Sequence, residues 1–243
     1  MGTNILLSKL GSCPQSAEEI HKYFSEVAEL LMNNYFISKR GINYEIVEIE
    51  FYLFNQQHQD IITYPRNSQA GEWFFHQSGV DLTFDSLDGQ FGGILIRGIK
   101  RITPRFEGDP CPSLILGPLK CVDELWDTFS AFSLNDFEYP LIVPGNVSKD
   151  ANIKNYPRWI PLNKKTIDKI GEEKTKMLKV KATIDKNIKY TNSNPNLKLQ
   201  GVYKSIDEEI ASGIMFNSRY RFLKEASIDT ESSDWKKYTA KPR

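Results

Sequence analysis

The chain has 243 residues, and its 31 lysines and arginines are balanced by 31 aspartates and glutamates, so its formal net charge is zero. This balance argues against a broad phosphate-binding surface over the whole protein, because affinity for nucleic acid comes largely from neutralised phosphates. The length suits one large domain with a sizeable core. We expect a single domain over residues 1–243, with residues 1–15 and 225–243 as peripheral tails.

No apolar run approaches the roughly 18 residues of a membrane span, and the first residues lack the pattern of a secretory signal. The three cysteines have no metal-ligand spacing, which favours a reduced compartment. We therefore expect a cytoplasmic monomer with no membrane association, no disulfide, no metal and no cofactor.

The first predicted element is an amphipathic helix over residues 17–33. Ser16 and Glu19 have the spacing of a capping box. Apolar residues then recur at helical spacing at Ile20, Phe24, Val27, Leu30 and Leu31. This helix is expected to be packing scaffold.

Residues 42–54, INYEIVEIEFYLF, form the strand around which the chain is organised. Its alternation gives one apolar face, made of Val47, Ile49, Phe51 and Leu53. Glu48, Glu50 and Tyr52 point the other way, and each is about 7 Å from the next along the strand. The second face therefore predicts a polar surface that is either the floor of a base-binding pocket or a solvent-exposed strand face.

A polar loop over residues 55–70 precedes a dense β region, with strands expected at residues 73–76, 79–85 and 92–99. The last of these, GGILIRGI, is apolar except for Arg97. A guanidinium inside an apolar strand is costly unless it is paired. We expect Arg97 to meet Glu48 or Glu50; the alternative is that it caps the strand end in solvent.

Residues 117–132 predict a helix that begins at a Gly-Pro pair. The pattern weakens over residues 144–198, where the lysine-rich stretch 164–189 is either a solvated face or a place for phosphate contacts. Two closing strands are expected at residues 199–203 and 213–223. The order of elements predicts an α+β fold, with a mixed, mostly antiparallel, curved β core and flanking helices.

Four blocks in this order resemble the methylpurine (alkyladenine) DNA glycosylases. They are VEIEFYL at 47–53, residues 71–84, GILIRGI at 93–99 and GPLKCVDEL at 117–125, with RYRFL at 219–223 similar to the family's closing strand. The resemblance implies a β core related to the C-terminal domain of formyltransferases. It also implies a monofunctional enzyme that excises alkylated or otherwise modified purines.

The resemblance carries site residues over by position. Glu50 matches the glutamate that deprotonates the attacking water, and Arg97 matches the arginine that helps to hold this water. Tyr52 and Phe75 match aromatic residues that sandwich the flipped base. His58 and Tyr64 are both candidates for the family's stacking histidine.

Two further positions depart from the family's residues. Asp85 falls where the family has an asparagine beside the base, and Ser78 falls at the tyrosine that wedges into the duplex. His76 is open to a core, supporting or catalytic role, and Asp81 is either a further pocket carboxylate or a polar outward residue.

The chemistry of the proposed site agrees with this resemblance. Breaking an N-glycosidic bond passes through a cationic sugar, which a carboxylate stabilises while it also deprotonates water. The expected partner is DNA, single-stranded or damaged, or a modified nucleobase. Two alternatives remain: a non-catalytic module that binds nucleic acid or a nucleobase on the same fold, and a hydrolase of free modified nucleosides.

Overall fold

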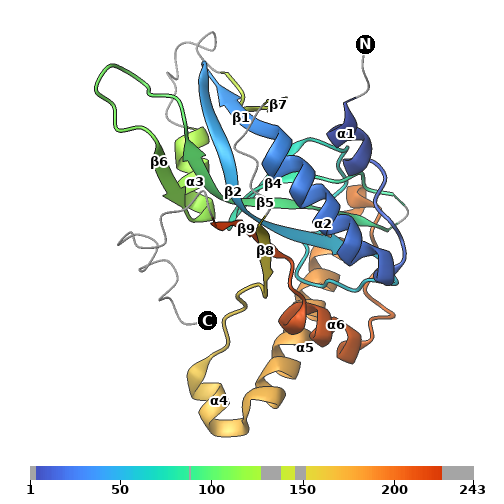
Figure 1. Cartoon of the computed structure of the whole chain (residues 1–243). Coiled ribbons are helices and arrows are strands. Elements are labelled where there is room, and N and C mark those ends of the chain that lie inside the picture. Colours follow the sequence, from blue (N-terminus) through green and yellow to red (C-terminus); the bar gives the residue numbers. More distant parts are fainter. Residues whose placement is uncertain (1–3, 88, 127–137, 146–151, 226–243) are drawn as a thin grey trace.

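The computed structural model describes residues 4–87, 89–126, 138–145 and 152–225 (Figure 1). Within these residues, the protein has an α+β fold in which a curled antiparallel sheet is flanked by helices. The fold class predicted from the sequence is therefore confirmed.

The sheet has nine strands, which are β1 (Tyr35–Lys39), β2 (Ile42–Phe54), β3 (Trp73–His76), β4 (Gly79–Thr83), β5 (Phe91–Arg101), β6 (Ser113–Leu116), β7 (Leu141–Pro144), β8 (Ile153–Tyr156) and β9 (Arg221–Lys224). The main order is β3-β4-β5-β2-β1-β7, while β6 pairs with β5, β9 with β2, and β8 with β9. One edge of β2 pairs with β5, and the other is shared by β1 and β9. The strand around which the sequence is organised thus lies in the middle of the sheet.

The helices are α1 (Ile5–Leu10), α2 (Ala17–Asn34), α3 (Pro118–Leu125), α4 (Lys164–Ile170), α5 (Glu172–Ser193) and α6 (Glu208–Asn217), with a short 3₁₀ turn, η1 (Pro195–Leu197). Figure 1 shows α2 lying across the sheet, and α4 with the adjoining part of α5 as a hairpin that projects away from it.

Helix α2 buries its apolar side against one face of the sheet, as its sequence predicts. Phe24 stacks on Phe51 of β2 with ring centroids 4.4 Å apart, and both side chains are fully buried. The predicted capping box is wrong in one respect, because the Ser16 side chain makes no capping hydrogen bond. Helix α2 is therefore stabilised by the packing of its apolar side rather than by a side-chain cap.

The opposite face of the sheet is covered only in part. At one end, Phe54 and Phe91 stack at 5.1 Å and pack with Val180 of α5 and Met215 of α6. At the other end, a small apolar cluster contains Val47, Leu116 and Leu223. Between these clusters the same face carries the polar side chains of β2.

Two elements of the second half differ from the sequence prediction. Residues 199–203 form no strand and lie largely in turns, and 213–217 belong to α6, so that only 221–223 of the second expected strand lie in β9. Helix α5 was not expected either. It is polar on most sides, so it lacks the apolar periodicity that marks a helix in a sequence.

Among the described residues, no helix is both long and apolar enough to cross a membrane. The expected tail at 225–243 lies outside the described residues except for Glu225, as do positions 127–132 of the helix expected at 117–132.

Candidate active site

Glu48 and Arg97 meet at an irregular point in the pairing of β2 with β5. Ile46 pairs with Ile99 and Ile49 with Ile96, but between them Glu48 lies opposite Gly98. Each strand therefore carries one extra residue here, and on β5 this residue is Arg97. A Cβ on Gly98 would lie 3.0 Å from the Cβ of Glu48, so a larger residue here would crowd the Glu48 side chain.

The same irregularity corrects one sequence prediction. Val47 was expected on the apolar face with Ile49 and Phe51, but it belongs to the separate cluster with Leu116 and Leu223. A bulge changes the alternation of side chains along a strand, and nothing in the local pattern marks it.

Arg97 binds both carboxylates of β2. Its Nε donates to Glu48 Oε1 and its Nη1 to Glu50 Oε2, each at 3.1 Å. Glu48 and Glu50 are 0% and 2% exposed, whereas the Arg97 side chain is 17% exposed. The predicted pairing is confirmed, and the alternative of a solvated strand face is wrong. Arg221 of β9 also donates to Glu48 Oε1.

Each glutamate keeps one oxygen that no hydrogen-bond donor of the described residues reaches. Glu48 Oε2 and Glu50 Oε1 are buried and accept no hydrogen bond from the described residues. A buried acceptor is costly to leave unpaired, so these oxygens are suited to accept from a water or from a ligand hydroxyl. Glu50 therefore has one oxygen held by protein donors and one buried oxygen with no donor among the described residues.

Tyr52 fixes Glu50 from the same strand. Its hydroxyl donates to Glu50 Oε2 at 2.6 Å. Burial and the neighbouring Glu50 carboxylate raise the pKa of Tyr52 well above its usual 10.0, so the phenol stays protonated and remains a donor. The guanidinium of Arg158 lies 4.9 Å from the centre of the Tyr52 ring. Arg158 therefore covers one face of the Tyr52 ring.

A fully buried ion pair between Arg158 and Asp60 packs against the Tyr52 ring. Arg158 donates to both oxygens of Asp60, at 2.7 and 2.9 Å, and to the carbonyl of Phe51 at 3.0 Å. The Arg158 and Asp60 side chains are 1% and 0% exposed. This pair joins the loop after β2 to the segment after β8, so it holds the floor of the site together.

A second polar cluster lies on the same sheet face, two strands from Glu50. Phe74, Asp81, Leu95 and Glu50 form one row of paired residues across β3, β4, β5 and β2. Buried Asp81 accepts from Arg66 at 2.6 Å and contacts His76 Nε2 at 3.0 Å. Burial raises the pKa of Asp81, but Arg66 and His76 lower it by more, so the carboxyl stays ionised.

Aromatic rings surround this second cluster. Tyr64 packs on His76 with ring centroids 4.5 Å apart, and Arg66 lies 4.0 Å from the centre of the Phe74 ring. Asp81 is thus a buried site-face carboxylate rather than an outward residue, and His76 supports it.

Phe75 is not a wall of the Glu50 site. It pairs with Val80 and follows Phe74, so it points to the opposite face of the sheet. There it packs edge-on against Trp126 at 4.9 Å and is 51% exposed. The prediction that Phe75 shares a pocket with Glu50 is wrong, because the match by position is one residue out of phase with the strand. Phe74 is the aromatic residue of β3 on the site face.

His58 and Asp85 also lie away from the Glu50 carboxylate. His58 is buried beside Phe24 and Tyr220 on the core side, with Nδ1 2.7 Å from the carbonyl of Leu53. Asp85 accepts from the Ala70 amide at 2.6 Å and ties that segment to α1. Both are structural in this fold, and their expected places beside the base are wrong.

The contacts of His58 predict a pH-dependent stability. Because the Leu53 carbonyl only accepts, Nδ1 carries the proton, and Nε2 accepts from Tyr220 at 2.8 Å. Burial lowers the pKa of His58 below its usual 6.5. The unfolded chain therefore binds the proton on His58 more readily than the folded chain does. The contribution of neutral His58 to the free energy of unfolding is fully present above pH 6.5 and is lost as the pH drops below it.

Urea unfolding at a series of pH values measures this slope. The exposed His21 provides the control, because His21→Gln should keep the wild-type slope while His58→Gln should flatten it. Equal slopes for wild type and His58→Gln would contradict the assignment.

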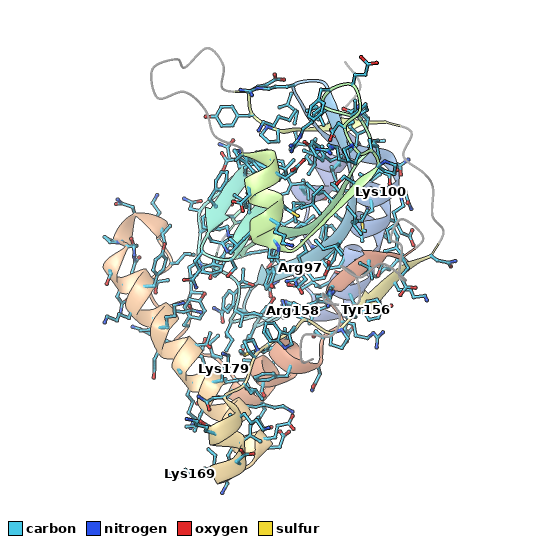
Figure 2. The ribbon with its side chains drawn as sticks, turned by 90° about the vertical axis from the view of Figure 1, so that its left-hand side faces the viewer. Arg97, Lys100, Tyr156, Arg158, Lys169 and Lys179 are labelled. Carbon is cyan, nitrogen blue, oxygen red and sulfur yellow. The ribbon has the colours of Figure 1, made fainter. Side chains whose placement is uncertain are left out.

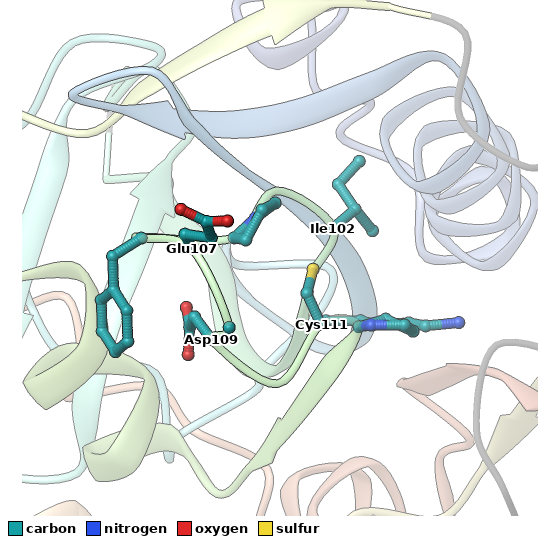
Figure 3. Close-up of a pocket in the computed structure, with 9 residues that line it drawn as sticks. Ile102, Glu107, Asp109 and Cys111 are labelled. Carbon is teal, nitrogen blue, oxygen red and sulfur yellow. The ribbon is translucent and has the colours of Figure 1, made fainter.

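One surface cavity lies elsewhere, at the loop between β5 and β6. It has a volume of about 550 Å³ and is lined by residues that include Ile102, Phe106, Glu107, Asp109 and Cys111 (Figure 3). The Glu50 cluster takes no part in its lining. Within the described ranges, no three His, Cys, Asp or Glu side chains are grouped so as to hold a metal ion.

Several site residues were missed by sequence reasoning. Asp60 and Arg158 are 98 residues apart, and Arg66 and Phe74 carry no distinctive spacing. Arg221 falls in the RYRFL block but was read only as part of a strand. Their roles depend on pairings between distant segments, which a single sequence does not display.

Comparisons with known proteins add one relative. The chain is similar to the uncharacterized protein L759 of Acanthamoeba polyphaga mimivirus, with 24% identity over 139 residues that cover 47% of this chain and 61% of that protein. The chain thus matches less than two thirds of the relative's length. No family model and no solved structure matches the chain.

Proposed function

We propose that this protein hydrolyses the N-glycosidic bond of an alkylated or otherwise modified purine, with Glu50 as the general base. The observation that carries the proposal is the asymmetry of the Glu50 carboxylate. Its Oε2 is held by Tyr52 and Arg97, while its buried Oε1 has no donor among the described residues. A water bound at Oε1 would be oriented by a carboxylate that cannot rotate away.

The surrounding charges suit this reaction. As the base leaves, the sugar gains positive charge, which the carboxylate groups of Glu50 and Glu48 would stabilise at close range. The hydrogen bonds from Arg97 hold both carboxylates in a fixed alignment. Preorganised groups of this kind need no rearrangement in the transition state, so they favour bond cleavage over simple binding.

The aromatic groups on the same face supply the base-binding part of the proposal. The Tyr52 ring and the group of Phe74, Tyr64 and His76 lie on either side of Leu95 and Gly93 of β5. A purine alkylated on its ring is cationic and is attracted to aromatic faces. These residues replace Phe75 and His58 in the proposed pocket.

The resemblance to the methylpurine DNA glycosylases agrees with this chemistry, and it remains a proposal. Three cysteines without a disulfide support a cytoplasmic location, which we propose on the same footing.

Release of free base tests the function. Oligonucleotides that contain alkyladenine or ethenoadenine, single-stranded and double-stranded, are incubated with the protein, and the products are separated by chromatography. We expect release of the modified base with the strand left intact, because the resemblance to the methylpurine DNA glycosylases places no lysine as a Schiff-base nucleophile. A parallel panel of modified nucleosides identifies a monomer substrate. Absence of release from every substrate would remove the proposal.

Tyr52→Phe distinguishes two roles of Tyr52, the positioning of Glu50 by the hydroxyl and the stacking of the base on the ring. The variant keeps the ring but loses the 2.6 Å hydrogen bond to Glu50. We expect a fall in kcat of about tenfold, from the loss of one hydrogen bond to a charged group, with little change in KM. Single-turnover kinetics measure both. A change confined to KM would show that the hydroxyl contacts the substrate instead.

A non-catalytic binding module is the second candidate. It is favoured by the ion pairs of the two glutamates. Arg97 pairs with both Glu48 and Glu50, and Arg221 also pairs with Glu48. Binding of modified oligonucleotides without any release would support it.

A further inference from the structure

The charges of this neutral protein are distributed unevenly. Residues 164–193, which form the hairpin of α4 and α5, contain nine lysines and four aspartates or glutamates, and therefore carry five net positive charges. The rest of the chain carries five net negative charges, because the total is zero. We refer to residues 164–193 as the lysine arm.

Most lysines of the arm are not neutralised. Lys176 pairs with Glu172 and Glu173, and Lys181 pairs with Glu208. The other seven make no ion pair with the described residues; they are Lys164, Lys165, Lys169, Lys174, Lys179, Lys186 and Lys189. Surface lysines that merely solubilise a helix are commonly interleaved with acids, whereas these leave an uncompensated field.

Four of these lysines share one side of α5. At about 100° per residue, Lys174, Lys179, Lys186 and Lys189 lie within an arc of about 140°. This arc is opposite the buried positions Val180, Asn187 and Thr191, while the fourth buried residue, Thr175, lies within it. The four lysines extend over about 22 Å at 1.5 Å per residue. This length and one-sided arrangement fit a linear polyanion that runs along the helix.

The lysine arm leads to the candidate active site. Figure 2 shows Lys169 near the tip of the hairpin, Lys179 closer to the protein body, and Arg158 and then Arg97 within the body beyond it. Lys186 lies 5.9 Å from the centre of the Tyr64 ring, which packs on His76 of the site face. Asn187 donates to the carbonyl of Ile61 at 2.7 Å and anchors the arm to the loop after β2.

The composition of the arm identifies the polyanion. Membrane-surface helices expose a continuous apolar side, but Val180, Ile184 and Ile188 of α5 pack against the protein body in the cluster around Phe54 and Met215, and Leu178 is the one large hydrophobic residue of the described α5 that is mostly exposed. Lysine is depleted in the cores of protein–protein interfaces. Lysines beside accessible aromatic rings, here Tyr64 and the 45%-exposed Tyr190, are typical of nucleic-acid grooves.

We propose that the lysine arm binds the phosphate backbone of a nucleic-acid strand and directs its bases toward the face that carries Glu50. This inference deepens the proposed function and rests on it for the identity of the polyanion. The arm supplies affinity without sequence specificity, because phosphate contacts carry no base information.

Fluorescence anisotropy with labelled oligonucleotides tests the inference. Wild type is titrated with a single strand and with the matching duplex over a series of salt concentrations, and the stronger ligand identifies which form the arm prefers. The test variant changes Lys174, Lys179, Lys186 and Lys189 to Gln. We expect affinity to fall by on the order of tenfold to a hundredfold, and the slope of log K against log salt to fall by about 3, since each phosphate contact contributes about 0.7 for a single strand.

The matched control changes Lys22, Lys120, Lys198 and Lys204 to Gln, which removes the same charge from exposed positions outside the arm. It should bind as wild type does, and melting curves show that both variants are folded. The proposal is overturned if wild type binds neither oligonucleotide, if the arm variant binds as tightly as wild type, or if the control loses as much affinity. Binding to phosphatidylserine vesicles in place of oligonucleotides would also overturn it.

Glu50→Gln separates this inference from the proposed function. The substitution lies outside the arm, so the variant should bind oligonucleotide with the wild-type salt slope. If no base is released by any form of the protein while arm-dependent binding remains, the glycosylase proposal fails and the lysine arm stands.

Discussion

Glu50→Gln is expected to reduce base release by about 10²- to 10⁴-fold, the usual contribution of a general base. Glutamine keeps the size of the side chain and an oxygen that can accept from the Tyr52 hydroxyl, but it cannot take a proton from water. Because Glu50 is only 2% exposed, bulk solvent does not replace it. Single-turnover release from a modified oligonucleotide measures the effect.

Glu29→Gln is the control for this variant, since Glu29 lies exposed on α2, away from the sheet face that carries Glu50. It should release base at the wild-type rate. A melting curve accompanies Glu50→Gln, because Arg97 loses one of its two charged partners on β2. Wild-type release by a folded Glu50→Gln protein would exclude Glu50 as the base.

Asp60→Asn is expected to destabilise the protein by about 3–5 kcal/mol, because it leaves the buried charge of Arg158 without a counter-charge. Both side chains are at most 1% exposed, so water cannot screen the loss. The Arg158 guanidinium also holds the Phe51 carbonyl and lies over Tyr52, so base release should fall together with stability. Urea unfolding with an unchanged m-value measures the free energy.

Glu26→Gln is a suitable comparison for Asp60→Asn. Its partner Lys9 is 40% exposed, so breaking this surface pair should leave the unfolding midpoint near that of wild type. Replacing both members of the buried pair by apolar residues, Asp60→Leu with Arg158→Met, should recover much of the loss, because no charge is then left buried. Full wild-type stability in Asp60→Asn would contradict an ionised pair.

Helix α2 and the strands β2 to β5 were predictable because each has a strong local pattern. Their apolar spacing, 3.6 for the helix and 2 for the strands, reports directly on burial. The pairing of Arg97 with Glu48 and Glu50 was predictable on the same ground, since a charge inside an apolar strand requires a partner.

Prediction from the sequence failed where a one-residue shift in strand register decides to which face of the sheet a side chain points. Phe75 and Phe74 are equally aromatic, and only the register of β3 on β4 assigns Phe74 to the site face. Val47 leaves the main core because of the paired irregularity at Glu48 and Gly98. Such shifts arise from hydrogen bonding between strands, which leaves no mark in either strand's own pattern.

By itself, the sequence determined the fold class, the central strand and the charges of the lysine arm, because these depend on composition and local periodicity. Only the tertiary structure decided which side chains share a site. Asp60 with Arg158, and Arg66 with Asp81, are brought together by chain segments that pack from different directions. Their identity as partners follows from burial, since an ionised group that loses water is retained only where an opposite charge replaces it.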